Sequence, residues 1–295
     1  MGYIYVIITT LMFSLIGTCV TLAKTWVSSD VISFARFFFG VLFLVAFMLA
    51  ARKKIALKLT GGAIWLGVVC KCINYLTENY AIAHGYSFGN IVVWPVQCVA
   101  ILLFALFFLH EKITPAAIVG VVLCVAGVGL ISWNGQSLDQ LLTGEGLFST
   151  LLFVIAGTGA AGFTMAQKML LDKMDTCNMN LSMFALSAAV TAAPLPVTAE
   201  FTGEFSIGAL FGLMMLGLVT CAAFILTAEA MKTLPVFLVT VIQSMNVLLT
   251  LAWSVLFFHE PITLWIIGGT LVFAVGMILV NLKKRIPKTE KESEV

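Results

Sequence analysis

The chain has 295 residues, of which 61% are hydrophobic and 10% are charged, with a formal net charge of +2 and a mean hydropathy of +1.09. Soluble domains contain about 25% charged residues, so this composition excludes a soluble enzyme and a nucleic-acid-binding protein. It indicates an integral membrane protein.

The apolar residues fall into long segments that predict membrane-spanning helices. A helix needs about 20 such residues to cross a hydrocarbon core about 30 Å thick. The chain offers ten of these segments, which we place near residues 3–23, 31–51, 63–83, 87–109, 115–133, 146–167, 178–198, 206–231, 233–258 and 264–282. The predicted fold is therefore an all-α polytopic membrane protein with ten transmembrane helices.

The basic residues predict the orientation of these helices, because Lys and Arg collect on the cytoplasmic side of a membrane. With the N-terminus inside, thirteen of the sixteen Lys and Arg residues lie in inner loops or in the tail. Only Lys24 then falls in an outer loop, while Arg36 and Lys71 lie within spans. We therefore expect both termini to be cytoplasmic.

A repeat divides the chain into two related halves. His-Glu-Lys-Ile-Thr at 110–114 recurs 149 positions later as His-Glu-Pro-Ile-Thr at 259–263. Glycines recur at the same offset, Gly120 with Gly269 and Gly127 with Gly276. The predicted organisation is a first five-helix repeat at 1–133, an outer linker at 134–145, a second repeat at 146–282 and a cytoplasmic charged tail at 283–295.

A unit with an odd number of spans must enter the membrane from opposite sides in its two copies, so the halves are predicted to be inverted. Inverted repeats suit alternating access, in which two similar bundles open in turn to the two sides of the membrane. The alternative is that duplication only built a stable helical body that transports nothing. The paired glycines, seven residues apart on one helical face, predict close helix packing rather than substrate contact.

These features resemble the EamA-type transporters of the drug/metabolite transporter superfamily. The resemblance rests on the ten-span layout, the repeated glycines, Pro95 in the fourth span, and the two turns that contain Glu111 and Glu260. The family usually has Gly before the Glu of that turn, whereas His stands there in both halves. Pro95 is matched by Ser244 in the second half. The resemblance implies transport of a small organic solute.

Polar residues within the spans are the candidates for substrate binding, since a charged side chain at the centre of a spanning helix costs roughly 2.5–3.5 kcal/mol on the insertion scale. In the third span Lys71, Asn74, Tyr75 and Glu78 are spaced i, i+3, i+4 and i+7, and so form one stripe. Arg36 lies in the second span. The fourth and ninth spans present related faces that carry Asn90, Trp94, Gln97, Gln243, Asn246, Thr250 and Trp253. We expect these faces to line a central cavity.

Two structural alternatives stay open for the charged residues. Lys71 and Glu78 would have a structural role, without contact with substrate, if they paired with each other or with Arg36. Arg36 would also have no contact with substrate if it reached the membrane surface or paired with Asp30. For the turn residues Glu111 and Glu260, capping of the turns is favoured over contact with the solute.

The predicted function is a secondary transporter that moves a small polar or zwitterionic metabolite, first an amino acid, with export as the expected direction. Glu78 would hold an ammonium group, Lys71 or Arg36 a carboxylate, and Tyr75, Trp94 and Trp253 an apolar portion. A choline-like cation held over an aromatic ring is the main rival. A membrane scaffold or intramembrane enzyme is a further alternative.

No motif predicts a cofactor, a metal site or catalysis, because the cysteines are scattered and no nucleotide-binding or Ser/His/Asp arrangement occurs. The expected partners are the solute and the lipid bilayer. Coupling to a proton, and a monomeric or homodimeric state, are left open. The expected location is the cell membrane, with a bacterial source.

Overall fold

The computed structural model of the protein describes residues 1–84, 89–107, 115–133, 145–259 and 263–281. These residues form helices joined by loops, and Val27 and Phe201 of two loops make one isolated β-bridge. The helices are α1 (Gly2–Ser14), α2 (Ile16–Ala23), α3 (Ser29–Ala50), α4 (Gly62–Ala83), η1 (Gly89–Val92), α5 (Val93–Phe107), α6 (Pro115–Trp133), α8 (Glu145–Leu170), α9 (Thr176–Ala192), α10 (Leu195–Thr198), α11 (Ile207–Ala230), α12 (Val236–Gln243), α13 (Asn246–Phe258) and α14 (Leu264–Asn281). The predicted all-α fold is thus observed in this part of the chain.

Each of the ten predicted segments contains a helix. Five described segments are long and apolar enough to cross a membrane: Gly2–Ala23, Ser29–Ala50, Phe148–Leu170, Ile207–Ala230 and Val236–Phe258. α4 has 22 residues, as α3 has, but its buried polar stripe makes it less apolar. The protein is therefore a polytopic membrane protein, while the count of ten spans and the side on which the termini lie stay predictions.

Two of the predicted spans are distorted near their middle, although the backbone there keeps right-handed helical angles. The first is divided at Leu15 into α1 and α2, and the ninth at Ser244 and Met245 into α12 and α13. At each break a serine hydroxyl donates to a carbonyl of the preceding turn, from Ser14 to Leu11 O at 2.7 Å and from Ser244 to Thr240 O at 2.9 Å. Such back-bonding often bends helices, but it is not sufficient for it, because Ser33 in α3 and Thr164 in α8 make the same kind of bond within continuous helices.

The seventh predicted span, 178–198, was wrong as one continuous helix. α9 ends at Ala192, and Pro194 precedes the separate short helix α10. Proline lacks a backbone N–H and disfavours the helical conformation of the residue before it, so a helix tends to end there. Pro95 does not have this effect, because it is the third residue of α5, where no intrahelical donor is needed.

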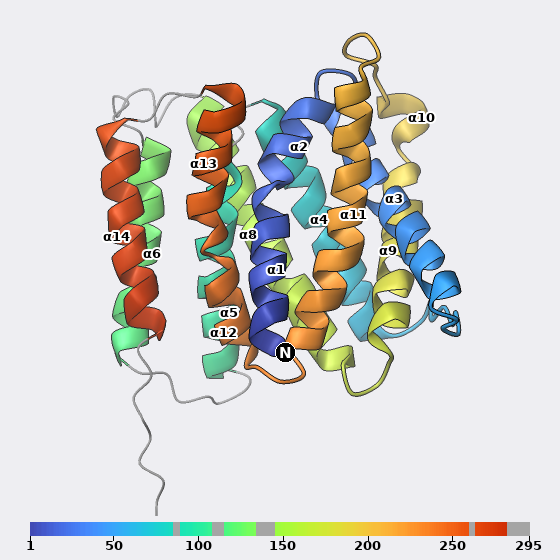
Figure 1. The fold of residues 1–295 in the computed structure, drawn as a ribbon, viewed down its shortest axis with the longest axis horizontal. Coiled ribbons are helices and arrows are strands. Elements are labelled where there is room, and N and C mark those ends of the chain that lie inside the picture. The colour runs from blue at the N-terminus through green and yellow to red at the C-terminus, as the bar shows by residue number, and fades with distance from the viewer. Residues whose placement is uncertain (85–88, 108–114, 134–144, 260–262, 282–295) are drawn as a thin grey trace, which may run out of the picture.

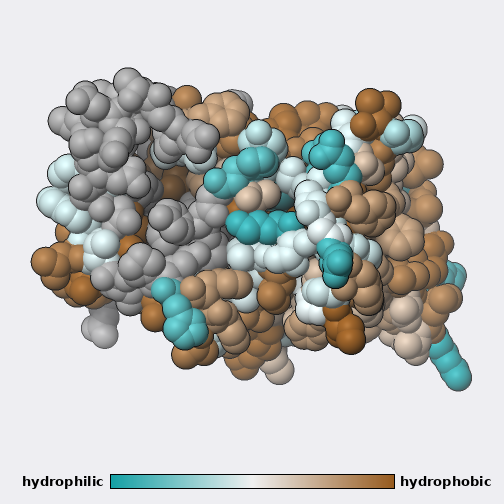
Figure 2. Space-filling model, turned by 90° about the horizontal axis from the view of Figure 1, so that it is seen from above, coloured by the Kyte–Doolittle hydropathy of each residue, from teal (hydrophilic) through white to brown (hydrophobic). Residues whose placement is uncertain are grey.

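The helices stand side by side as one bundle (Figure 1). α6 and α14 form one edge, α3 and α9 lie toward the other edge, and α1, α4, α8 and α11 stand between. Seen from one end, polar residues gather over the middle of the bundle while apolar residues form much of its flank (Figure 2). This distribution is the one expected for a helical bundle whose flank faces lipid and whose end faces water.

The pairing of α6 with α14 depends on the repeated glycines. A Cβ atom at Gly127 would lie 2.6 Å from Gly269 O, and one at Gly276 would lie 2.6 Å from Gly120 O. Residue numbers therefore rise along one helix as they fall along the other, so the two helices are antiparallel. The absence of side chains at these positions lets the two backbones touch.

Candidate functional site

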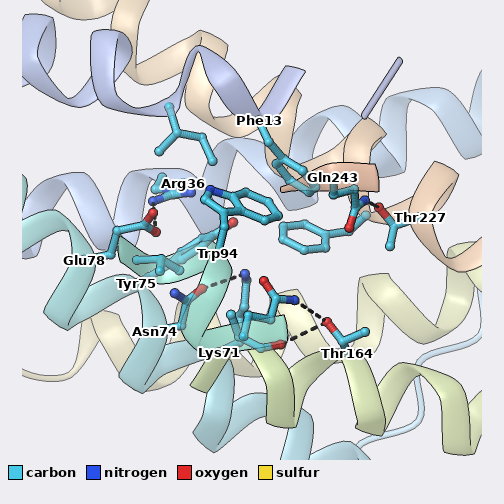
Figure 3. Close-up of a pocket in the computed structure, with 15 residues that line it drawn as sticks. Phe13, Arg36, Lys71, Asn74, Tyr75, Glu78, Trp94, Thr164, Thr227 and Gln243 are labelled. Atoms are coloured by element: carbon cyan, nitrogen blue, oxygen red, sulfur yellow. Dashed lines mark hydrogen bonds and ion pairs between the residues drawn. The ribbon is translucent and has the colours of Figure 1, made fainter. Parts of the chain in front are cut away.

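A cavity lies in the centre of the bundle, where elements of both sequence halves meet (Figure 3). Its volume is about 30 Å³, which is room for water but not for a metabolite. Side chains must therefore move apart before a solute of amino-acid size can enter. The polar side chains that line the cavity are Arg36, Lys71, Asn74, Tyr75, Glu78, Gln97, Thr164, Thr227 and Gln243.

The stripe on α4 faces this cavity. Lys71, Asn74, Tyr75 and Glu78 are all at most 4% exposed and all line it. Their spacing follows the helical period, so one face of α4 presents all four side chains to the same space. The opposite face of α4 is apolar and more exposed, as at Ile73.

Arg36 and Glu78 form a buried ion pair between α3 and α4. Arg36 Nη1 lies 3.3 Å from Glu78 Oε2, and the two side chains are 1% and 5% exposed. The same nitrogen donates to Asn79 Oδ1 at 2.8 Å, and the guanidinium carbon lies 3.5 Å from the centre of the Tyr75 ring. Arg36 therefore pairs with Glu78, one of the two alternatives open from the sequence, and not with Asp30.

Lys71 projects into a group of aromatic rings. Its Nζ lies 4.2 Å from the ring centre of Tyr75, 4.9 Å from that of Phe163 and 4.0 Å from that of Phe224. It also donates to Asn74 Oδ1 at 2.8 Å. Each ring face attracts a cation, and the attraction is stronger where water is excluded. In the described part of the chain no carboxylate lies within 4.0 Å of this ammonium group.

Glutamines of α5 and α12 complete the polar lining. Gln97 donates to Thr164 Oγ1 of α8 at 3.0 Å. Gln243 donates to Thr9 Oγ1 of α1 at 3.0 Å and to Thr227 Oγ1 of α11 at 2.8 Å. Trp94 lies between Gln243 and the Arg36–Tyr75 side of the cavity, with its ring centre 5.3 Å from that of Phe13 (Figure 3). The cavity thus combines aromatic walls with a few fixed polar groups, as small-molecule sites do.

Three predicted residues of the ninth span lie outside this lining. Thr250 donates to Ser14 O at 3.3 Å, and Trp253 Nε1 donates to Ser14 Oγ at 2.9 Å. Asn246 is fully buried, and neither of its side-chain polar atoms has a partner among the described residues. Thr250 and Trp253 thus contact the end of α1 next to Leu15. The three residues do not line this cavity, and a role for them in substrate binding stays a prediction.

The hydrogen bond from Trp253 to Ser14 leads to a testable expectation about the stability of the protein. Replacing Trp253 with Phe removes the donor to Ser14 while keeping an aromatic ring, so we expect a loss of about 0.5–1.5 kcal/mol in the free energy of unfolding. Thermal unfolding of the purified protein measures it. Trp65→Phe, which loses the bond from Nε1 to Leu59 O at an exposed position, is the matched control. An equal effect in both variants would contradict a special role for the contact at Ser14.

The remaining predicted residues are placed as follows. The side chain of Asn90, in η1, lies outside the described residues, as do Glu111 and Glu260. Gly120, Gly127, Gly269 and Gly276 lie between α6 and α14, away from the cavity. The glycine-rich part of α8 brings that helix onto α4, since a Cβ atom at Gly159 would lie 2.6 Å from Cys70 O.

Sequence reasoning missed several residues for which a signal existed. Asn79 continues the α4 stripe at i+8, a position of the same helical face. Phe224 and Thr227 follow Tyr75 and Glu78 at the repeat offset of 149, so applying that offset to the third span would have found both. Phe13 recurs as Phe153 at an offset of 140, but this match alone does not indicate a cavity, and Thr164 belongs neither to a polar stripe nor to a matched pair.

Comparison with known proteins identifies the family. Residues 1–133 and 147–282 match the EamA-like transporter family. The chain belongs to that family. The resemblance to EamA-type transporters is thereby confirmed, and the protein is a membrane transporter.

Two further likenesses accompany the family match. The "Uncharacterized transporter YojE" of Bacillus subtilis (strain 168) is 23% identical over 272 residues, which is 88% of this chain and 86% of that protein. A solved chain described as "Crystal structure of protein" superimposes with a TM-score of 0.76 at 15% identity, covering 95% of this chain and 98% of the other. The second likeness shows that this chain shares its fold with that solved structure.

Proposed function

We propose that this EamA-family protein is a secondary transporter that moves a small metabolite, first an amino acid or a related compound, through the central cavity by alternating access. The observation that carries the proposal is the buried cavity in which α1–α5 of the first sequence half meet α8, α11 and α12 of the second. A cavity between two related bundles changes its access when the bundles move against each other.

The packing of α6 against α14 supports an inverted arrangement of the halves. These two helices are the equivalents of each other in the repeat, and they run antiparallel with reciprocal contacts. A Cβ atom at Gly127 would lie 2.6 Å from Phe273 N, and one at Gly276 would lie 2.7 Å from Cys124 N. Phe273 follows Cys124 by 149 residues, the repeat offset. Such reciprocity is expected around a two-fold axis in the membrane plane.

The breaks in the first and ninth spans support movement at the cavity. Leu15 and Ser244 interrupt two helices that touch each other and flank the lining residues Phe13, Ile16 and Gln243. Interrupted helices beside a central site are a recurrent feature of secondary transporters. We expect the helix segments on either side of these breaks to tilt when the cavity opens.

Counterflow in proteoliposomes tests the transport proposal. Vesicles that contain the purified protein and are loaded with one unlabelled amino acid are expected to accumulate the radiolabelled form of that amino acid. Vesicles in which the protein has a defined orientation report whether export is favoured. Replacing Trp94 with Ala removes a wall of the cavity, so we expect transport to fall by at least about tenfold, equivalent to 1.4 kcal/mol. Trp65→Ala changes an exposed tryptophan outside the cavity and is the control.

The outcomes separate the candidate functions. Accumulation of quaternary amines without amino acids would favour the organic-cation transporter. No accumulation of any metabolite from a broad library would contradict the transporter and favour the scaffold. Equal losses from Trp94→Ala and Trp65→Ala would contradict the assigned cavity while leaving transport in place.

A further inference from the structure

The cavity is lined by more basic than acidic side chains, and this difference bears on the charge of the cargo. Arg36, Lys71 and Glu78 are its charged lining residues in the described part of the chain. The carboxylate of Glu78 already accepts from Arg36 at 3.3 Å, with both side chains buried. Lys71 is left with an amide oxygen and three aromatic rings. Of the two basic residues of the lining, Lys71 is thus the one that has no carboxylate within 4.0 Å in the described part of the chain.

A cationic cargo is disfavoured by this arrangement. An ammonium group that approached Glu78 would meet the guanidinium of Arg36, which is paired with Glu78 Oε2, bonded to Asn79 and stacked on Tyr75. It would also approach Lys71, a like charge in a medium from which water is largely excluded, where repulsion is strong. Two of the aromatic rings of the lining, those of Tyr75 and Phe224, already face the Lys71 ammonium group.

An anionic cargo is favoured by the same arrangement. A buried ammonium group without a counter-ion is costly, and an incoming carboxylate supplies both the missing charge and a strong hydrogen-bond acceptor. Lys71 offers one compact cationic group, and the walls near it are the rings of Tyr75, Phe224 and Trp94. A single ammonium group among aromatic walls matches a monocarboxylate better than a phosphate, which carries more charge and needs more donors.

We infer that the transporter selects its cargo by a carboxylate that binds Lys71, with an apolar or aromatic remainder against the surrounding rings, and that an amino group on the cargo is dispensable. This inference rests on the proposed transport function and sharpens its substrate class. Glu78 then serves to hold Arg36 in place and does not receive the ammonium group of an amino acid. Small organic acids without an amino group become substrates alongside amino acids.

Matched ligands test this on the wild-type protein. Phenylalanine carries both groups, 3-phenylpropanoate lacks the amino group, and phenylalaninamide lacks the carboxylate. We expect the first two to raise the melting temperature of the full-length protein and to compete with each other in counterflow, with affinities within about tenfold. The amide and choline are expected to do neither. Binding of the amide or of choline as strongly as of the acids would overturn the inference.

Variants of Lys71 provide the second part of the test. Lys71→Met keeps the length of the side chain but removes the charge, and we expect affinity for 3-phenylpropanoate to fall by at least about tenfold. Lys71→Arg is expected to retain measurable acid binding, which reports that the site itself has folded. Unchanged acid affinity in Lys71→Met would overturn the inference.

The failures of the two proposals can be told apart. Counterflow of a library compound that has no acid group would overturn the carboxylate inference and leave the transport function standing. If the protein moves no compound in either direction, and no acid raises its melting temperature, both proposals fail.

Discussion

Arg36→Met is expected to destabilise the folded protein by about 3–5 kcal/mol, because it leaves the buried carboxylate of Glu78 without its counter-charge. Glu78→Gln is expected to act in the same direction, since it removes the other charge of the pair. Both groups lie at the interface of α3 and α4, with 1% and 5% exposure, so water cannot replace the lost partner. Thermal and denaturant unfolding in a mild detergent measures both variants.

The double variant Arg36→Met/Glu78→Met makes the prediction specific. Replacing both charges with apolar groups of similar size removes the need for compensation, so we expect part of the lost stability to return. Lys232→Met is the control, because Lys232 also pairs with a glutamate, Glu229 at 2.7 Å, but is 40% exposed. Its loss is expected to cost less than about 1 kcal/mol. A double variant less stable than both single variants would contradict the interpretation.

The second large effect is expected at the contact between α6 and α14. Gly127→Ala places a methyl group 2.6 Å from Gly269 O and from Phe273 N, and Gly269→Ala places one 2.5 Å from Gly127 O. Backbone atoms cannot move aside as a flexible side chain can. We expect each variant to lose about 1–3 kcal/mol of stability and the two helices to move apart.

Neighbouring glycines of the same helices provide matched controls. A Cβ atom at Gly129 or at Gly268 would have no neighbour within 4 Å. Gly129→Ala and Gly268→Ala are therefore expected to be neutral or to stabilise by up to about 1 kcal/mol through better helix propensity. Unfolding of the four variants, with counterflow alongside, measures the difference. Equal behaviour of all four would show that close backbone contact does not hold this helix pair together.

The cavity was partly predictable from local sequence patterns. The polar stripe of α4 was found from its spacing, because residues at i, i+3, i+4 and i+7 must share one face of a helix. Trp94, Gln97 and Gln243 were found because the repeat aligns the fourth and ninth spans. The same alignment predicts that Asn246, Thr250 and Trp253 belong to the site. They lie outside the lining of this cavity, where Thr250 and Trp253 are bonded to Ser14, and a role for them in substrate binding stays a prediction.

The partners of the charged residues were not predictable. Arg36 and Glu78 are 42 residues apart, and two pairings were open until α3 was seen to lie against α4. The rings around Lys71 come from three helices, with Phe163 and Phe224 in the second half. No local pattern identifies such contacts, because they depend on how helices far apart in the chain approach each other.

Taken alone, the amino-acid sequence determined that this is a helical membrane protein with a duplicated architecture and an unusual polar face on its third span. Hydropathy, charge bias and helical period are properties of neighbouring residues, and the insertion of a segment into lipid depends directly on them. The tertiary structure decided which charged residues pair with each other, where the helices are distorted, and which polar residues reach the cavity. These outcomes depend on packing between distant segments, which lipid does not dictate and only the assembled bundle defines.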